Sequence, residues 1–503
     1  MGRFLPTILL CILAAVTACG RRAGCDGPSL NTSQLSSVRE FGLQSAGPRG
    51  YLVVPNPIDA TENIYASVND SRVVNSTEDY SLPSLLTPQR LESAFIKTRI
   101  RSVNDAASML ATPNGTGEFR FNPSDIHYSE TMAYRSLTAI QAYIETLGFQ
   151  VVQSRPLYVM VQAEAGSTIN AFYDHAYLNP ASPRTIKLYG ATQFAPGVDQ
   201  DMYWHEFGHL FNESVTGESG MDYAGDLGAV WTEGAALHEC LADYLAESVS
   251  DKSYIGKWVA RNLPGYQPGE PLRSAEDDWG RLDFRAIATA DGKGTTPERY
   301  QVAEWCSRVL WDIRQSFVDD NPETGSMLSD RMIYSAASLL GRDSSLSEFK
   351  RALLSADSEL HCGGHESVIQ SAFESRGFFE APTLSRDLEI NASSTVARSS
   401  VSQVGKVTFL FRIRNSNSVT ARNVRVVLEP LDARLKASTY MQAFGDLAPG
   451  KTIGVGTSGG MSTDFSVTGT VDAGVASGQR LRYRLRLLSE GGADVLFNAE
   501  VAL

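Results

Sequence analysis

The sequence predicts a multidomain protein in which an α+β domain with a metal-binding helix precedes an all-β domain. Two observations carry this prediction. Residues 205–209 read His-Glu-Phe-Gly-His within a stretch of helical periodicity. From about residue 385 onward, apolar residues alternate with polar ones, which is typical of half-buried antiparallel strands. At 503 residues and 43% hydrophobic content, the chain can build two or three domains with separate cores.

The chain begins with the features of an exported lipoprotein. Residues 4–16 form an apolar run of signal-peptide length that is too short to span a bilayer. The following Val-Thr-Ala-Cys resembles a bacterial lipobox, so we expect a signal peptide over 1–18 and a lipid on Cys19 that anchors the protein to the membrane. Gly20 favours the outer membrane within the bacterial cell envelope. An ordinary signal peptide cut nearby is the alternative.

A tether and a small segment separate this leader from the metal-binding region. Residues 19–48 are rich in Gly, Ser, Asn and Arg and poor in apolar residues, which is typical of a flexible linker. Residues 49–118 place short apolar runs between Pro, Asn and Asp. This pattern predicts a small β-rich segment followed by a helical piece at about 88–110.

The His-Glu-Phe-Gly-His pentapeptide predicts a metal site. Asp199 can cap a helix that runs to about Thr216. On that helix His205 and His209 are one turn apart, so both imidazoles leave the same face and can bind one ion. Glu206 lies beside them, where a general base acting on a metal-polarised water would stand.

A second helical stretch, at about 233–248, supplies a third ligand. Glu239 and Asp243 are again four residues apart on one face. We expect Glu239 to bind the metal and Asp243 to orient a ligand imidazole through its other ring N–H. Glu233 is the rival ligand, but it has no acidic residue four positions later.

These motifs resemble the thermolysin and fungalysin families of zinc endopeptidases, the gluzincins. The resemblance covers about residues 119–380 and implies a zincin-like α+β peptidase domain with Zn²⁺ as the cofactor. It implies metal ligands, a catalytic Glu, residues that support the ligands and residues that contact an extended substrate peptide. In this sequence the metal ligands are His205, His209 and Glu239, and the catalytic residue is Glu206. The residues that support the ligands are Asp243, His238 and Asp201, and the substrate contacts are Asn170, Ala171 and Arg273.

Two positions depart from the family pattern. His238 stands where thermolysin-like enzymes usually carry Asn. Where these families place a His that steadies the oxyanion, this chain offers Tyr300, or Arg299 if the register slips by one. A phenol hydroxyl or a guanidinium can donate to a developing oxyanion, so we expect Tyr300 to take this catalytic role.

The C-terminal region predicts an immunoglobulin-like β-sandwich over 385–503. Apolar residues alternate with others over 407–413, and again over 481–487, where Arg occupies the positions between them. Turn sequences such as Pro449-Gly450 separate the strands. The Arg rows are typical of a solvated sheet face, although the domain could also carry a surface ligand.

Net charge and cysteine content restrict the partners, metal sites and disulfides that the protein can have. A net charge of −13 without a basic stripe argues against a nucleic-acid partner. No Cys-x-x-Cys spacing exists, so a Cys-ligated zinc is not expected. Outside the leader and Cys19, four cysteines remain, and one of their three full pairings joins Cys306 to Cys362.

The function expected from these features is a lipid-anchored zinc endopeptidase with protein or peptide substrates. A catalytically silent surface binding or adhesion protein of the same fold is the first alternative; the complete His-Glu-His-Glu set argues against it, and the missing His argues for it. A zinc hydrolase acting on other bonds is the second alternative. The edge strand at Asn170 and Ala171 argues against that alternative, because such a strand suits extended peptides.

Overall fold

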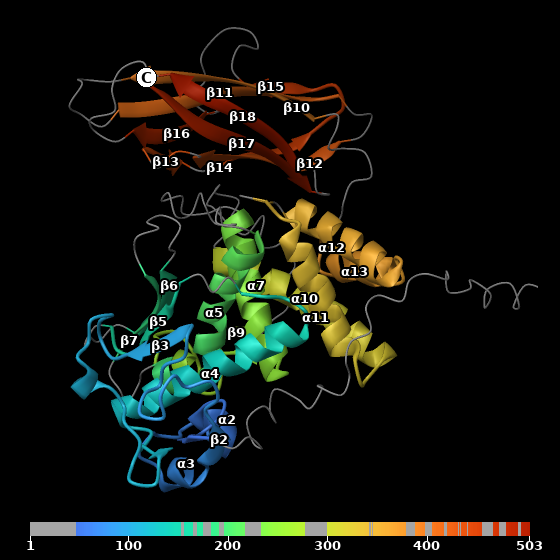
Figure 1. Cartoon of the computed structure of the whole chain (residues 1–503). Helices are drawn as coiled ribbons and strands as arrows, with labels where there is room; N and C mark the ends of the chain where they lie inside the picture. Colours follow the sequence, from blue (N-terminus) through green and yellow to red (C-terminus); the bar gives the residue numbers. More distant parts are fainter. Residues whose placement is uncertain are drawn as a thin grey trace, which may run out of the picture.

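The computed structural model describes residues 47–502 with internal gaps (Figure 1). The gaps are 152–154, 164–168, 175–182, 191–195, 217–232, 277–298, 342–343, 345, 379–387, 398–404, 417–419, 431, 433, 440, 455–465, 472–478 and 491–493. The predicted signal peptide, Cys19 and nearly all of the tether lie outside the described residues. A mixed α/β part from β1 to α13 is followed by an all-β part.

The first segment forms a small sheet and short helices. The sheet has the order β2-β1-β4, with β1 at Arg49–Leu52, β2 at Glu78–Ser81 and β4 at Glu118–Phe119. Two short helices, α2 (Pro57–Thr61) and α3 (Ser71–Asn75), lie between β1 and β2.

The helix predicted at about 88–110 is wrong. The segment contains β3 (Ile96–Arg99) and a single 3-10 turn, η2 (Ala107–Met109). Ile96 and Thr98 are buried while the residues between and after them are half-buried, which is a period-2 pattern. Four residues are too few for this pattern to stand out from a helical one in the sequence.

A four-stranded sheet of order β3-β5-β7-β6 supports the predicted metal-binding helix. β5 (Leu157–Met160) pairs in parallel with β3 and with β7 (Arg184–Tyr189). β6 (Asn170–Asp174) pairs antiparallel with β7 and lies at the edge. The long helix α4 (Ile126–Thr146) contacts β1, β3 and α5, and one hydrophobic core joins residues 52–378. Residues 49–118 therefore share their core with the region that carries the predicted metal ligands.

Helices α5 and α7 carry the predicted metal ligands. α5 spans Gln200–Thr216 and begins after the short turn η3 (Pro196–Val198), while α7 spans Glu233–Ser250. Asp199 directly precedes α5, where the sequence predicted the N-cap, and its Oδ2 atom accepts from the backbone N–H of Val259 at 3.3 Å. A Cβ atom on Gly208 would lie 2.6 Å from the Cα of Ala242, so only glycine permits this approach of α5 to α7.

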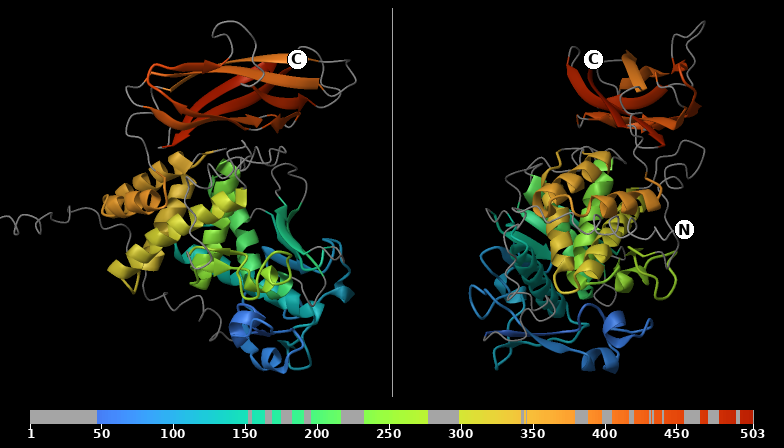
Figure 2. Two further views of the ribbon diagram at one scale, coloured as in Figure 1. Left: turned by 180° about the vertical axis from the view of Figure 1, so that it is seen from behind. Right: turned by 90° about the vertical axis from the view of Figure 1, so that its right-hand side faces the viewer.

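Four longer helices follow in the described part of residues 299–378 (Figure 2). They are α10 (Arg299–Asp320), α11 (Gly325–Ser338), α12 (Leu346–His361) and α13 (Glu366–Ser375). A disulfide between Cys240 and Cys306 ties α7 to α10. The disulfide excludes the pairing of Cys306 with Cys362, one of those that the sequence left open, because α7 packs against α10 with Cys240 next to Cys306.

Short elements connect α7 to α10. They are β8 (Tyr254–Ile255), α8 (Lys257–Ala260) and β9 (Arg273–Ser274). β8 and β9 pair antiparallel, with Ile255 opposite Arg273. The described residues 251–276 contain only these brief pieces of regular structure.

The C-terminal part contains two antiparallel sheets, which Figure 1 shows apart from the helices. One sheet has the order β10-β11-β16-β13, with β15 also paired to β11, and the other has the order β14-β12-β17-β18. The strands are β10 (Leu388–Ala397), β11 (Gly405–Asn415), β12 (Ala421–Pro430), β13 (Leu435–Thr439), β14 (Met441–Leu447), β15 (Thr452–Gly454), β16 (Ser466–Val471), β17 (Arg480–Glu490) and β18 (Asp494–Ala502).

The strands expected at 407–413 and 481–487 are confirmed as parts of β11 and β17. Along β17 the side chains of Leu481, Tyr483, Leu485 and Leu487 are buried, while Arg482 is exposed. This alternation follows the predicted period of two. The assignment of the two sheets to an immunoglobulin-like sandwich stays a prediction.

Within the described residues, no helix has the length and apolar character needed to cross a membrane.

Candidate metal centre

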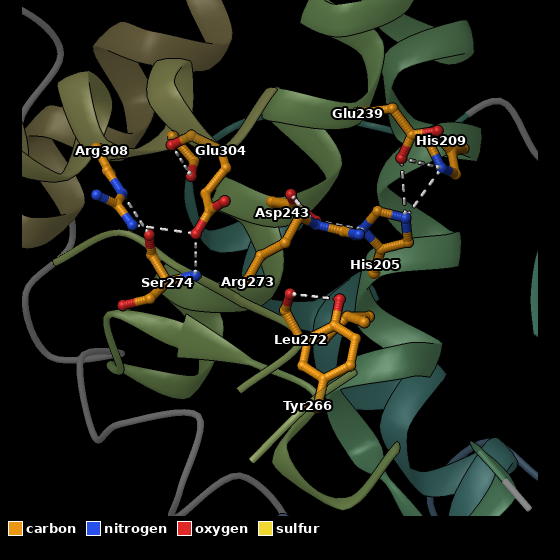
Figure 3. A network of polar contacts seen from close by, with 11 residues as sticks. His205, His209, Glu239, Asp243, Tyr266, Leu272, Arg273, Ser274, Glu304 and Arg308 are labelled. Carbon is orange, nitrogen blue, oxygen red and sulfur yellow. Dashed lines mark hydrogen bonds and ion pairs between the residues drawn. The ribbon is translucent and has the colours of Figure 1, made fainter. Parts of the chain in front are cut away.

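His205, His209 and Glu239 meet at one point between α5 and α7, as predicted (Figure 3). The Nε2 atoms of the two imidazoles are 3.2 Å apart. Glu239 Oε2 lies 3.4 Å from His205 Nε2 and 3.7 Å from His209 Nε2. All three residues are buried, and among the described residues they form the one group of this kind that could hold a metal ion. The rival Glu233 is the first residue of α7, six residues before Glu239.

Glu206 is a buried carboxylate beside this trio. Its carboxylate accepts a hydrogen bond from the backbone N–H of Tyr173 in β6, and its Oε2 atom has no hydrogen-bond partner among the described residues. Burial raises the pKa of Glu206 to about 7, although the neighbouring His205 opposes this shift. The group can therefore accept and release a proton near neutral pH.

Asp243 and Arg273 contact the Nδ1 atom of His205, the ring nitrogen that does not face Glu239. The Nδ1 atom of His205 lies 2.7 Å from Asp243 Oδ1. Arg273 donates to both oxygens of Asp243, at 2.5 Å from Nε and 2.7 Å from Nη2. Burial raises the pKa of Asp243, but the charges of Arg273 and His205 lower it below its usual value. The ionised carboxylate accepts the Nδ1–H and leaves Nε2 free to bind a metal. Arg273, predicted to contact substrate, is thus also a partner of Asp243.

His238 contacts the Nδ1 atom of His209, the ring nitrogen that does not face Glu239. The two Nδ1 atoms are 2.7 Å apart and the rings are stacked with centroids 4.6 Å apart. One Nδ1 must donate and the other must accept; when Nε2 of His209 binds a metal, its Nδ1–H is the donor. Asn212 of α5 donates to the carbonyl of His238 at 3.0 Å and fixes it in place.

We predict that His238→Asn keeps most of the metal affinity while His238→Ala loses it. An Asn side-chain carbonyl can accept the Nδ1–H of His209, whereas Ala leaves that donor buried without a partner. Loss of such an outer partner costs about 10–100-fold in metal affinity. Competition with a coloured chelator measures the affinity. Equal affinity in the Asn and Ala variants would show that His238 does not orient His209.

Asp201 does not support the metal trio, contrary to the prediction. It lies one turn before His205, and its Oδ2 accepts from the backbone N–H of Gly256 at 3.1 Å. Its charge interacts with those of Asp199, Asp59 and Lys252. Burial raises the pKa of Asp201 to about 6. The four-residue spacing places Asp201 one helical turn before His205, but its carboxylate binds the backbone of Gly256, the residue that precedes α8.

The predicted substrate residues Asn170 and Ala171 lie at the start of β6. They pair with Tyr189 and Leu188 of β7, and the other edge of β6 is unpaired in the described sheet. β6 contacts α5. An extended chain could add to this edge next to Glu206.

Tyr300 is the second residue of α10 and lies close to the site. The guanidinium carbon of Arg273 lies 5.3 Å from the centroid of its ring, and Tyr300 is 38% exposed. The adjacent Arg299 is the first residue of the same helix.

Three charged residues near the site were missed by the sequence reasoning. Glu304 and Arg308 of α10 bind the backbone of Ser274, next to Arg273. Glu247 of α7 is buried with no hydrogen-bond partner for either oxygen among the described residues, and burial raises its pKa well above the usual value. Four-residue spacing was the available signal, since Glu247 follows Asp243 by four and Arg308 follows Glu304 by four.

Comparisons with known proteins do not assign the chain to a family. No protein family matches the sequence, and no curated protein does. A solved structure, the alkylpurine DNA glycosylase AlkC of Pseudomonas fluorescens bound to DNA containing an abasic site analog, is 11% identical. The match covers 76% of this chain and 97% of that chain with a TM-score of 0.15. A TM-score this low carries no argument about fold or function.

Proposed function

We propose that the protein is a zinc-dependent endopeptidase that hydrolyses peptide bonds with an activated water. The observation that carries the proposal is the convergence of His205 Nε2, His209 Nε2 and Glu239 Oε2 beside the unpaired oxygen of Glu206. Two imidazoles and one carboxylate, with a fourth position left for water or substrate, are a donor set of catalytic zinc.

The spacing of the three ligand atoms fits Zn²⁺. Ligands about 2.0–2.1 Å from a tetrahedral ion lie about 3.3–3.4 Å from one another. The three separations here are 3.2, 3.4 and 3.7 Å. Both Nδ1 atoms contact other residues, so the two Nε2 atoms can face a common cation.

Each residue of the site has a defined task in the proposed reaction. Bound zinc would polarise the scissile carbonyl and lower the pKa of water. Glu206 would take a proton from the attacking water and pass it to the leaving amine. The free edge of β6 would bind the extended substrate backbone next to Glu206. The resemblance to thermolysin and fungalysin supports the same roles.

We further propose that the enzyme works in the bacterial cell envelope, attached to the outer membrane by lipid on Cys19. The lipobox-like sequence supports the anchor. The disulfide between Cys240 and Cys306 supports an oxidising compartment, because cytoplasmic thiols are kept reduced. The C-terminal sheets could position the enzyme on a surface ligand.

Metal content and proteolysis of casein together test the proposed function. We expect one zinc per chain after metal-free purification and zinc repletion, and zinc-dependent cleavage of casein. Zinc binding without cleavage of casein or of a random peptide library would favour the catalytically silent surface protein. That alternative has some support, because Tyr300 replaces the family's His. Protein that binds no zinc would overturn the proposal.

We predict that Tyr300→Phe lowers kcat and leaves KM nearly unchanged. If the phenol hydroxyl donates to the oxyanion, the hydrogen bond exists mainly in the transition state, and its loss costs about 10²–10³ in rate. The Phe ring retains the contact with Arg273. Steady-state kinetics on one peptide measure both constants. Unaltered turnover would move the role to Arg299 or to a residue between 251 and 298.

A further inference from the structure

The segment 272–274 connects the metal site to α10. Arg273 binds Asp243 through two hydrogen bonds, and Asp243 in turn binds His205. The segment itself is short, since β9 contains only Arg273 and Ser274. On one side of Arg273, the backbone N–H of Leu272 donates to the carbonyl of Ile255 at 2.9 Å. The carbonyl of Leu272 accepts from the hydroxyl of Tyr266 at 3.4 Å.

On the other side, two residues of α10 bind both backbone groups of Ser274 (Figure 3). Glu304 Oε1 accepts from the N–H of Ser274 at 3.1 Å, and Arg308 Nε donates to its carbonyl at 2.8 Å. Arg308 Nη2 also lies 3.1 Å from Glu304 Oε1, so the two side chains hold each other. These two hydrogen bonds hold the backbone of Ser274 against α10.

We propose that Glu304 and Arg308 are positioning residues of the metal site. Through Ser274 they fix the backbone of Arg273, and Arg273 then fixes Asp243 and the ring of His205. This inference rests on the proposed function. The chemical task of the pair is to keep the Nε2 atom of His205 aimed at the metal during turnover.

Burial distinguishes this pair from an ordinary surface ion pair. An exposed Glu–Arg pair four residues apart contributes only about 0.3–0.5 kcal/mol to a helix. Here the Arg308 side chain is 2% exposed and that of Glu304 is 22% exposed, and both are directed at one backbone residue rather than at solvent. The helix that carries them is itself fixed, because Cys306 joins it to Cys240, next to Glu239. A displaced Ser274 would therefore move relative to the metal ligands.

Conservative and disruptive variants of the full chain test the proposal. Glu304→Gln keeps an acceptor for the Ser274 N–H and should retain near-parental behaviour, whereas Glu304→Ala should not. Arg308→Lys cannot reach both the Ser274 carbonyl and Glu304 in the same geometry. For Glu304→Ala and Arg308→Lys we expect about a tenfold fall in kcat with little change in KM, the lower end of the range for direct partners of a ligand.

A second readout does not depend on hydrolysis. Co²⁺ placed in the site absorbs visible light according to the geometry of its ligands. Glu304→Ala and Arg308→Lys should change this spectrum and weaken zinc affinity several-fold, while Glu304→Gln should not. The matched control is Asp312→Asn, which breaks another two-point ion pair of α10, with Arg376, away from Ser274. The control should keep the parental spectrum, zinc affinity and kcat.

A double-mutant cycle with Arg273→Lys tests whether Arg308 affects the metal site through Arg273. If Arg308 acts through Arg273, Arg308→Lys should cause little further loss of zinc affinity in that background. Additive losses, or parental spectra and zinc affinity in folded Glu304→Ala and Arg308→Lys, would overturn the proposal. Failure of the proposed function gives a different pattern: the parent then binds metal without cleaving peptides, and the spectrum and affinity still decide whether the pair positions the site.

Discussion

Glu206→Gln should abolish peptide hydrolysis and leave the zinc in place. The amide has nearly the shape of the carboxylate, but it cannot take a proton from water. Loss of a general base costs about 10²–10⁴ in rate, and here the same group would also deliver the proton to the leaving amine. The three metal ligands are untouched, so the metal content should equal that of the parent.

Kinetics and metal analysis of one preparation check this prediction. Asp201→Asn is a suitable control, because it makes the same carboxyl-to-amide change on the same helix, one turn from His205, at a residue outside the metal trio. The control should keep most of the activity. Hydrolysis at the parental rate by Glu206→Gln would show that another group is the base, and loss of zinc would show that Glu206 also supports the metal.

His209→Ala should remove zinc, hydrolysis and the stability that zinc provides. The imidazole supplies one of three protein ligands, and Ala also leaves His238 without its ring partner. An ion that binds only the folded chain adds about 2.7 kcal/mol to the free energy of unfolding at 100 times its Kd. The thermal midpoint of the parent should therefore rise with added zinc, and that of the variant should not.

Thermal unfolding with and without zinc, beside metal analysis, measures this effect. His127→Ala is the control for removal of an imidazole, because His127 contacts Glu130 of α4 and is not one of the trio. Its zinc stoichiometry and zinc-induced shift should match those of the parent. A His209→Ala protein that still binds one zinc per chain with parental affinity would rule out the ligand assignment.

The part of the site that could be predicted depends on helical spacing. His205 and His209 had to share a face once α5 was recognised, and Glu239 and Asp243 had to share a face of α7. The four side chains meet because the two helices pack against each other. Residues that reach the site from short or irregular elements carried no such period. Only a family resemblance placed Arg273 at the site, as a substrate contact, and its hydrogen bonds with Asp243 were not predicted.

The rest of the fold and site depended on packing between distant segments. Asp201 has the right spacing on α5, yet its carboxylate binds the turn at Gly256, which no local pattern shows. The disulfide joins cysteines 66 residues apart, and sequence alone left three pairings open. Likewise β3 is recognised as a strand through its partner β5, about 60 residues later, because its own four residues are too short a pattern.

Gly208 has a consequence for any experiment that substitutes residues across the metal motif. The motif needs only its two histidines and the glutamate for chemistry, so the chemistry alone leaves the two positions between Glu206 and His209 open to variation. In this chain a methyl group at 208 would meet the backbone of Ala242 at 2.6 Å, and Phe207 is completely buried. A saturation screen for activity should therefore find position 208 as intolerant as the ligands, although Gly208 offers no side chain to a metal ion.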